Sequence, residues 1–512
     1  MNSSVKSLVR DWFNNISPPV FFGAAFVTLA IIFFGAIWPE SAASLFNNTL
    51  SVTTEYLGWY YILAVAFFMV FVLWLYFGPF GHLKIGPQDS EPEFGLLTWF
   101  SMLFAAGMGM GLVFWGVAEP ITHYNSPPLA EPKTLAAVEE AMKFSFYHWG
   151  FHPWAIYIIF GLGIGIFHFR YGLPLAPRSL LYPIFKEKIN GPFGHCVDIF
   201  CTVGTLLGVA TSLGLGAMQI NSGLSGLMGI AFEENVQVII IAIITLVATF
   251  STVTGVHKGI KYLSILNIML MVALLTFVFI AGPTLFQTKI FMSTLGKYLQ
   301  EIVQLSLWMD MRTENNWQAN WTIFYWGWWM SWCPFVGIFI ARISKGRTIK
   351  EFVLFVFLIP SFVNFLWFSV FGGTALHLEF LGNGGISETV KSNVAMSLHT
   401  LLSHLPWASL TQWVGVILVI IFFITSSDSG SLVDDMVTSG GNPDPPVLNR
   451  VFWGFAEGAV AAVLLFVGGL KALQVASISA GLPQSFLVVA CCYSLVKAFK
   501  HDRQFIKKRT VA

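Results

Sequence analysis

Apolar stretches of about 20 residues recur along the whole chain, and they restrict its possible folds more than any other feature. Twelve such windows can each cross a membrane as a helix, and they cover residues 19–38, 58–78, 95–117, 146–168, 198–220, 236–254, 263–285, 320–341, 350–372, 408–433, 451–470 and 473–497. With 56% hydrophobic and only 10% charged residues, the 512-residue chain is too apolar for a soluble fold. The sequence therefore predicts an all-α polytopic membrane protein with 12 transmembrane helices.

Basic residues are divided unevenly among the segments that join these spans. If both termini are cytoplasmic, 20 of the 27 Lys and Arg residues lie on the cytoplasmic side, as the positive-inside rule favours. Only Lys6 and Arg10 precede the first full-length span, so we expect this span to remain as a helix rather than to be cleaved as a signal. The net charge of +1 gives no indication of a nucleic-acid partner.

The third span contains a glycine run, Gly107-Met-Gly-Met-Gly111, followed by Gly116. Each glycine disfavours a helix by roughly 1 kcal/mol relative to alanine. An unwound backbone inside a membrane is tolerated only where protein or a water-filled cavity satisfies its polar groups. The run therefore favours a broken helix beside a ligand or ion site near mid-membrane. Close helix packing is the alternative, because small residues also let backbones approach each other.

Aromatic residues concentrate in the fourth span, at Tyr147–Tyr157, and in the eighth, at Phe324–Phe339. In the eighth span a helix would align four of them in one stripe: Trp328, Trp332, Phe335 and Phe339. Trp329 is expected to point about 100° away from this stripe. An interfacial aromatic belt is the alternative, although the stripe continues past Pro334, deeper than such a belt would. Buried indoles offer negative π-faces without formal charge, which suits a quaternary ammonium or sulfonium group.

The tenth span carries hydroxyl groups and an acid within Thr425–Ser431. The hydroxyls of Thr425 and Ser426, together with carbonyls freed by the glycine break, supply the oxygen ligands that a hard cation requires. Helix packing by these small polar residues is the alternative. Asp428 is a candidate functional residue because ionisable groups inside a span are rare and costly.

Other polar residues suggest contacts near the ends of spans. Asp434 and Asp435 are expected at the cytoplasmic mouth, where ion pairs to Arg342 or Lys345 would close a gate. Two outer segments, residues 132–144 and 291–309, look amphipathic, and each is expected to lie at the membrane interface. The second of them could instead brace several spans from outside, and ordinary loops are the alternative for both.

A pair of histidines in the fourth span, His148 and His152, has a spacing that can bind a metal on one helix face. No third ligand is evident from the sequence. We therefore expect no metal site there.

From about residue 18 to 497 the chain resembles the betaine/choline/carnitine transporter family. The matching residues are the glycine run with Val117–Pro120, then His148, Trp149, Trp154 and Tyr157, the block Trp321–Phe335, the basic run Ala341–Arg347, and Thr425–Ser429. The resemblance implies a fold similar to that of the leucine transporters, with two leading helices, an inverted five-plus-five repeat and a homotrimer in a bacterial inner membrane. In such a repeat the glycine-broken third span corresponds to the eighth.

The implied organisation is a cytoplasmic N-terminus at 1–18, two leading helices at 19–94 and a first five-helix repeat at 95–286. An interfacial helix follows at 287–319, then a second five-helix repeat at 320–497 and a short basic cytoplasmic tail at 498–512. These boundaries are expectations of the resemblance and of the span pattern together.

The family's substrates carry a trimethylammonium or similar onium group, and the resemblance implies where this chain would bind one. The implied substrate residues are Trp149, Trp154, Tyr157 and Trp329 in a cage, Trp332 and Phe335 along the access path, and Met108 and Gly111 in the glycine run. The implied sodium ligands are carbonyls of Ala105, Met108 and Phe422 with the hydroxyls of Thr425 and Ser426. Candidates for a second sodium site are Thr205, Thr211 and Ser212.

Departures from the family's subgroups indicate the coupling ion. Proton-coupled choline members tend to carry Asp where this chain has Gly111, which favours sodium here. Carnitine exchangers lack the regular glycine pattern, and osmosensing members have long charged tails, unlike the short basic stretch Lys497–Ala512. Nutrient uptake is therefore an alternative to osmoprotection.

The resulting expectation is import of a glycine betaine-type zwitterion by sodium symport and alternating access. No cofactor besides the coupling ions and no enzymatic activity are expected. The alternatives are uptake of dimethylsulfoniopropionate or choline, with protons as the other coupling ion, and a less favoured ion channel.

Overall fold

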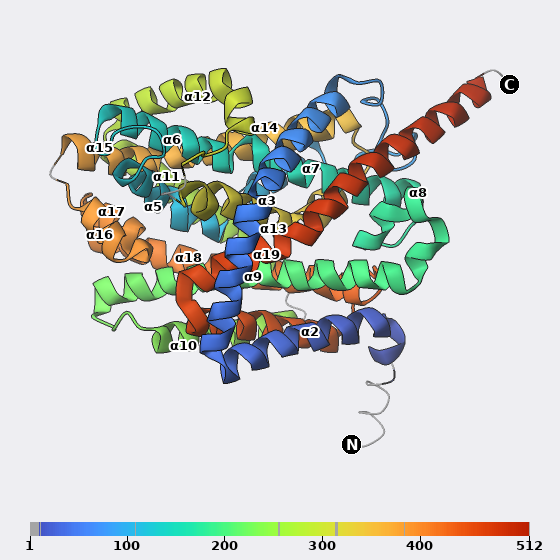
Figure 1. Ribbon diagram of the computed structural model, residues 1–512, viewed down its shortest axis with the longest axis horizontal. Helices are drawn as coiled ribbons and strands as arrows, with labels where there is room; N and C mark the ends of the chain where they lie inside the picture. Colours follow the sequence, from blue (N-terminus) through green and yellow to red (C-terminus); the bar gives the residue numbers. More distant parts are fainter. Residues whose placement is uncertain are drawn as a thin grey trace.

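A computed structural model of the chain describes residues 10, 12–107, 109–253, 257–312, 316–382 and 384–510. Within these ranges the structure is helical, and its only strand-like pairing is an isolated bridge between Lys84 and Thr348 (Figure 1). The longer helices are α2 Pro18–Ile37, α3 Pro39–Phe77, α4 Leu96–Gly107, α5 Met110–Asn125, α6 Leu135–Trp149, α7 Phe151–Gly165, α9 Pro192–Met228, α10 Glu234–Val253, α11 His257–Ala281, α12 Thr284–Leu307, α13 Phe324–Ile343, α14 Ile349–Trp367, α18 Ala408–Thr438 and α19 Val447–Thr510.

Shorter helical segments join or extend these helices. They are η1 Ile166–Arg170, η2 Pro177–Leu181, α8 Tyr182–Phe185, η3 Lys186–Asn190, η4 Ala319–Ile323, η5 Phe368–Gly372, α15 Gly373–Leu381, α16 Ile386–Ser392, η6 Val394–Met396 and α17 Ser397–Ser403. Three of these segments are π-helical turns that lengthen a membrane-crossing helix. The turn η1 continues α7, η4 directly precedes α13, and η5 directly follows α14.

Each predicted span overlaps a helix of the structure. Among the described residues, nine helices are long and apolar enough to cross a membrane, or ten if a bent pair counts as one span. α19 covers the last two predicted spans and consists of two helices joined at a kink, where Gly468 and Gly469 have non-helical backbones and the φ of Gly469 is 56°. The chain is thus a multi-pass helical membrane protein, and the twelve-span count remains a prediction.

The predicted glycine break in the third span is present. α4 and α5 are bent relative to each other by 57°, and Gly109 at the junction has an extended backbone. In contrast, α13 continues through Pro334 and Gly337 without a break. The eighth span therefore does not mirror the break in the third, and the inverted repeat stays a prediction.

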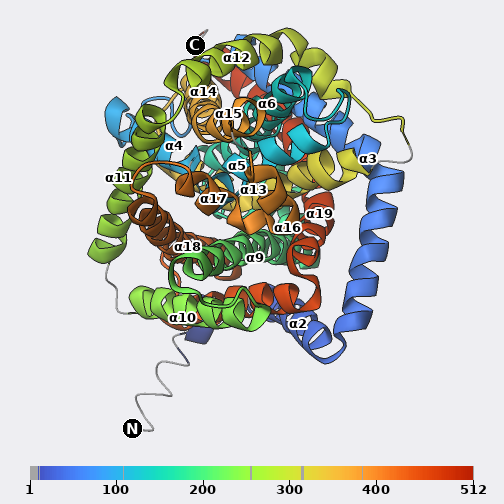
Figure 2. The same ribbon diagram turned by 90° about the vertical axis from the view of Figure 1, so that its left-hand side faces the viewer.

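The centre of the molecule is built around α13. This helix packs against α7, α9 and α19, and Figure 2 shows it with α5 in the interior, while α2, α3, α10, α11 and α12 lie around the outside. Large aromatic side chains fill the space between these central helices: Trp115, Trp326, Trp328, Trp367 and Trp453 are all fully buried. The eighth span therefore lies in the core. Its aromatic residues cover the whole circumference of the helix because neighbouring helices surround α13 on several sides.

The two segments expected at the membrane interface pack against each other. α6 covers the first and is largely buried, while α12 covers the second and lies across α3, α6, α14 and α15. Lys143 of α6 and Glu301 of α12 form an ion pair at 2.6 Å, and a second ion pair joins Glu139 to Lys297. The bracing role proposed for the second segment fits this arrangement. In the first segment, residues 132–136 are mostly exposed and residues 137–144 are mostly buried in the protein interior.

Candidate functional site

A cavity of about 350 Å³ lies between the two halves of the broken span and the central helices. Its walls come from α4, α5, α7, α11, α13, α14 and α18, with Trp149 from the end of α6. Among the described residues that line it, none is charged. The volume falls in the range of small-molecule sites, which are mostly apolar with a few placed polar groups.

Aromatic rings form one side of this cavity. Trp149, Trp154, Tyr157, Trp328 and Trp329 all line it, and each is at most 5% exposed. The rings of Trp149 and Trp329 meet edge to face at 4.9 Å, and those of Trp154 and Tyr157 at 5.3 Å. These side chains are therefore buried in the protein and do not form an interfacial belt.

Trp329 does not point away from the aromatic stripe of α13. It lines the same cavity as Trp328 and stacks on it, with centroids 4.8 Å apart and planes at 12°. The indole N–H of Trp329 donates to the carbonyl of His148 at 2.9 Å, which turns this ring toward α6. An indole is wide enough that two neighbours about 100° apart on a helix can still share a wall, so the expectation based on helical spacing was wrong here.

The aromatic wall continues toward the C-terminal end of α13. Trp332 and Phe335 are partly buried, and their rings meet edge to face at 5.4 Å. Phe339 also lines the cavity and is 38% exposed, so the cavity reaches the protein surface at this end. The three residues thus form a path between the buried rings and the outside.

Gly111 is packed directly beneath the indoles. A Cβ at this position would lie 2.6 Å from Cη2 of Trp328 and 3.2 Å from Cη2 of Trp149. The absent side chain is what allows both rings to reach the cavity. Met108, the other glycine-run residue implied for substrate and sodium, lies outside the described residues.

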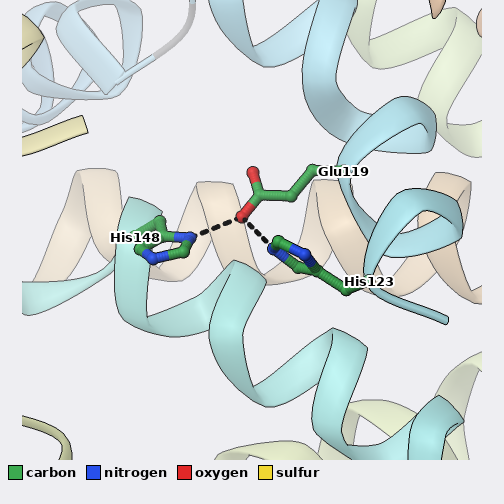
Figure 3. A group of neighbouring side chains, drawn as sticks. All are labelled: Glu119, His123 and His148. Atoms are coloured by element: carbon green, nitrogen blue, oxygen red, sulfur yellow. Dashed lines mark hydrogen bonds and ion pairs between the residues drawn. The ribbon is translucent and has the colours of Figure 1, made fainter. Parts of the chain in front are cut away.

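A buried carboxylate forms hydrogen bonds with side chains of the aromatic wall and of the helices around it. Glu119 of α5 is fully buried, and its Oε2 accepts hydrogen bonds from the indole N–H of Trp149 at 2.8 Å and the Tyr325 hydroxyl at 2.5 Å. Its Oε1 lies 2.7 Å from His148 Nδ1 and 3.2 Å from His123 Nε2 (Figure 3). Glu119 thereby links α5, α6 and α13, and sequence reasoning did not single it out.

The two histidines of the fourth span belong to different networks. His148 joins Glu119 and His123, whose ligand atoms lie within 4.8 Å of one another and could hold a metal ion. His152 instead contacts the Tyr298 hydroxyl at 3.0 Å and the Ser306 hydroxyl at 2.7 Å. The possible metal partners of His148 are therefore Glu119 and His123, both from α5, rather than His152. Hydrogen bonds already occupy both oxygens of Glu119 and both ring nitrogens of His148.

The hydroxyl groups expected for sodium share the cavity with the aromatic rings. Thr425 and Ser426 line it, as do Ala105 and Phe422. The Thr425 hydroxyl donates to the carbonyls of Ile421 at 2.9 Å and Phe422 at 3.2 Å, which leaves its lone pairs available to a cation. The structure therefore brings together four of the five residues implied for the first sodium site.

The candidates for a second sodium site do not converge. Thr211 bonds to the Ser477 hydroxyl at 2.7 Å and to the Leu473 carbonyl, both on α19. The hydroxyl of Ser212 reaches only the carbonyl of Gly208, and that of Thr205 has no hydrogen-bond partner. Thr205 and Thr211 face about 120° apart around α9. None of the three lines the cavity.

The expected gate between acidic and basic residues is not formed. Asp434 and Asp435 are fully buried, and no hydrogen bond reaches their carboxylate oxygens. The exposed Arg342 instead points its guanidinium at the sulfur of Met436, at 3.9 Å. Both acids are enclosed rather than placed at an aqueous mouth, because the C-terminal part of α18 is buried and this helix packs against α9, α10, α11 and α19.

Two asparagines supply polar groups that sequence reasoning missed. Asn364 donates to the Trp149 carbonyl at 2.8 Å, and its buried Oδ1 has no hydrogen-bond partner. Asn267 of α11 also lines the cavity with a buried, unpartnered Oδ1. Both residues lie in otherwise apolar spans, and an isolated polar residue in such a span was the signal that could have identified them.

The amino-acid sequence was compared with known protein families and with individual proteins. The sequence pattern of the betaine/carnitine/choline family transporters (BCCT) matches residues 19–504. The glycine betaine transporter OpuD of Bacillus subtilis is 44% identical, with 96% of each chain covered. Glycine betaine transporter 1 of Vibrio parahaemolyticus is 39% identical over 97% of this chain and 96% of its own. A glycine betaine/proline/choline/ectoine transporter of the same organism is 40% identical over 96% of this chain and 89% of its own.

Proposed function

Because this chain belongs to the betaine/carnitine/choline transporter family, we propose that it imports a glycine betaine-type zwitterion by sodium symport. Transport would proceed by alternating access, with the cavity exposed to one side of the membrane at a time. Its relatives are named as transporters, and the protein is a transporter rather than an enzyme.

The observation that carries the substrate assignment is an aromatic cavity without a charged wall. Five aromatic side chains line one side of it, and no described lining residue carries a charge. A quaternary ammonium group has no N–H to donate, so it gains little from hydrogen-bond acceptors. It is attracted to the faces of indole rings by about 0.5–2 kcal/mol each.

Sodium coupling is supported by the position of the hydroxyl groups. Thr425 and Ser426 line the same cavity as Ala105, at the end of the broken span. A cation there would hold α18 against α4 and so favour the shape of the cavity that accepts substrate. Gly111 leaves no carboxylate in the glycine run, which supports sodium rather than protons as the coupling ion.

The remaining expectations complete the proposal. The basic-residue bias supports cytoplasmic N- and C-termini, and the family supports a bacterial inner membrane and a homotrimer. Under this orientation the C-terminal end of α13, next to Arg342 and Lys345, is cytoplasmic. The cavity opens near Phe339 at that end, so the conformation would be inward-facing.

The test is uptake of labelled glycine betaine into proteoliposomes with and without an inward sodium gradient. Thr425→Ala should abolish the sodium dependence, while Thr411→Ala on the same helix but outside the cavity should retain it. Unchanged sodium dependence in Thr425→Ala would reject the ion site. Competition by unlabelled choline, dimethylsulfoniopropionate, proline and ectoine ranks the substrates, and a failure of all onium compounds to compete would reject the substrate class.

A further inference from the structure

One glutamate and two histidines bring three possible metal ligands together next to the aromatic wall (Figure 3). Glu119, His123 and His148 are all fully buried. Glu119 Oε1 lies 2.7 Å from His148 Nδ1 and 3.2 Å from His123 Nε2. Glu119 and His123 are one turn apart on α5, whereas His148 comes from the last turn of α6. Helix packing thus assembles one carboxylate oxygen and two imidazole nitrogens from two segments of the chain.

The types and spacing of these three atoms suit a divalent transition metal. Two imidazole nitrogens and one carboxylate oxygen are a common ligand set of Zn²⁺. Bonds of about 2.0–2.1 Å in a tetrahedral site place the ligand atoms about 3.3–3.4 Å apart. The distance from Glu119 Oε1 to His123 Nε2 is already close to this value. The two imidazole nitrogens are at most 4.8 Å apart, so they would approach each other by no more than about 1.5 Å.

Hydrogen bonds on the far atoms of two ligands would hold them in place around a metal. Glu119 Oε2 accepts from the Trp149 N–H and the Tyr325 hydroxyl, which fixes the carboxylate while Oε1 binds the ion. His148 Nε2 lies 3.0 Å from the Thr322 hydroxyl. With a metal on Nδ1, the ring hydrogen of His148 moves to Nε2 and is donated to Thr322. Histidines that bind metals usually donate their other N–H in this way.

Aromatic rings enclose His123 and exclude water from the site. The ring centroids of Trp321 and Trp317 lie 4.5 and 4.9 Å from that of His123. His123 Nδ1 has no hydrogen-bond partner, so it can carry the ring hydrogen without losing a bond when Nε2 binds the ion. Ser126, three residues further on, is exposed just beyond the end of α5. This end is periplasmic in the proposed orientation, so a metal would enter from the periplasm.

We propose that Glu119, His123 and His148 form an inhibitory binding site for Zn²⁺ or a chemically similar divalent metal, beside the transport cavity. In the described part of the chain, the ion-pair partners of Glu119 are these two histidines. A buried carboxylate requires a compensating positive charge. Either a proton on an imidazole or a bound metal supplies it here, and the experiment below separates the two.

The inhibitory effect follows from the contacts between the site and the cage residues. Glu119 holds the indole of Trp149, and the carbonyl of His148 accepts from the indole N–H of Trp329 at 2.9 Å. A metal that binds when α5 and α6 are placed as they are here favours this conformation over others. Alternating access requires at least two conformations, so an occupied site slows transport. This effect rests on the proposed function, whereas binding of the metal does not.

The binding experiment uses Co²⁺ as the probe, because its visible absorption reports the type and geometry of its ligands. The purified full-length protein without a histidine tag carries Cys196→Ser, which removes the exposed thiol. It should bind about one Co²⁺ per chain with a tetrahedral spectrum, and Zn²⁺ should displace the ion. His123→Gln should abolish this spectrum. His152→Gln, the same change at a buried histidine outside the site, should retain it.

A graded variant tests the outer hydrogen bond. Thr322→Val keeps the side-chain shape but removes the acceptor of the His148 Nε2–H, and it should lower the Co²⁺ affinity about 10- to 100-fold. A merely structural role of His123 would not produce this effect. Size-exclusion chromatography and thermal unfolding monitor folding, and His148→Gln replaces His123→Gln if the latter does not fold.

Uptake measurements test the inhibitory role. Zn²⁺ should slow uptake of labelled glycine betaine into proteoliposomes, a chelator should reverse the effect, and His123→Gln should be insensitive to Zn²⁺. Equal inhibition of the His123→Gln protein would overturn the inhibitory role. Uptake that is absent even without Zn²⁺ would contradict the proposed function, and the Co²⁺ experiment would still decide the metal site.

Two results of the binding experiment would overturn the metal site itself. Absence of a tetrahedral Co²⁺ spectrum in the Cys196→Ser protein would mean that a proton compensates Glu119. Persistence of the spectrum in both His123→Gln and His148→Gln would assign the ion to another place.

Discussion

Single residues control the aromatic wall through packing and through one buried charge. Gly111 makes room for Trp149 and Trp328, and Glu119 holds Trp149 and Tyr325 by hydrogen bonds. The space left by Gly111 and the hydrogen bonds of Glu119 can each be removed by a single substitution that leaves every aromatic residue unchanged.

Gly111→Ala should weaken substrate binding because the new methyl group would lie 2.6 Å from Trp328 Cη2. Forcing a methyl group into a packed interior costs about 1–3 kcal/mol, and displacement of the indole would transmit this cost to the cavity. The measurement is glycine betaine binding followed by tryptophan fluorescence. Gly296→Ala on α12 meets no atom within 4 Å and should bind normally. Normal affinity in Gly111→Ala would show that Trp328 adjusts without loss.

Glu119→Gln should lower substrate affinity roughly 10- to 100-fold, because hydrogen bonds to a charged group contribute about 1.5–3 kcal/mol. The neutral amide also places an N–H group where the wild-type carboxylate oxygen accepts hydrogen bonds, so one set of donors would face another donor. Calorimetric binding of glycine betaine measures the change. Glu140→Gln is the matched control, since this second buried glutamate on α6 accepts from the Leu129 N–H, away from the cavity. Equal losses in both variants would assign the effect to general destabilisation.

At the scale of helices, α12 is held against α6 by charge as well as by apolar contact. Its buried residues form one stripe, Gln287, Ile290, Thr294, Tyr298 and Leu305, while the Lys143–Glu301 pair lies at the edge. Tyr298 of this stripe contacts His152, so α12 also supports the helix that carries Trp154.

A double-mutant cycle with Lys143→Gln and Glu301→Gln should give a coupling energy of about 0.2–1 kcal/mol, because both partners are partly exposed. The readout is the shift in thermal unfolding temperature, measured at low and high salt. Lys289→Gln, an exposed charge on α12, should be additive with Glu301→Gln. Zero coupling between positions 143 and 301 at low salt would argue against a bracing role for this ion pair.

At the scale of the whole molecule, the cavity connects to the surface at one end. Phe339 is 38% exposed there, while the rings at the other end are at most 5% exposed. The proposed orientation makes the open end cytoplasmic.

Phe339→Cys should therefore react with a membrane-impermeant thiol reagent in inside-out vesicles and not in right-side-out vesicles. Cys196→Ser provides the background, since Cys196 is the exposed native cysteine and the other four are buried. Bound glycine betaine should slow the reaction because the residue lies on the access path. Reaction only from the outer side would reverse the proposed orientation.

The sequence alone determined the features that depend on local chemistry. The apolar windows predicted helices that the structure contains, and the glycine run predicted the break between α4 and α5, because glycine weakens a helix wherever it stands. The aromatic residues implied for the cage indeed line one cavity, although their role in binding stays a prediction.

Only the tertiary structure decided how distant residues meet. It joined Glu119 to the indole N–H of Trp149 and buried Asp434 and Asp435, the acids expected at an open mouth. A helical period specifies which face of one helix a residue occupies, but not which face of another helix packs against it. Those pairings follow from the packing of all the helices together, and they created the uncharged aromatic cavity and enclosed the two acids of α18.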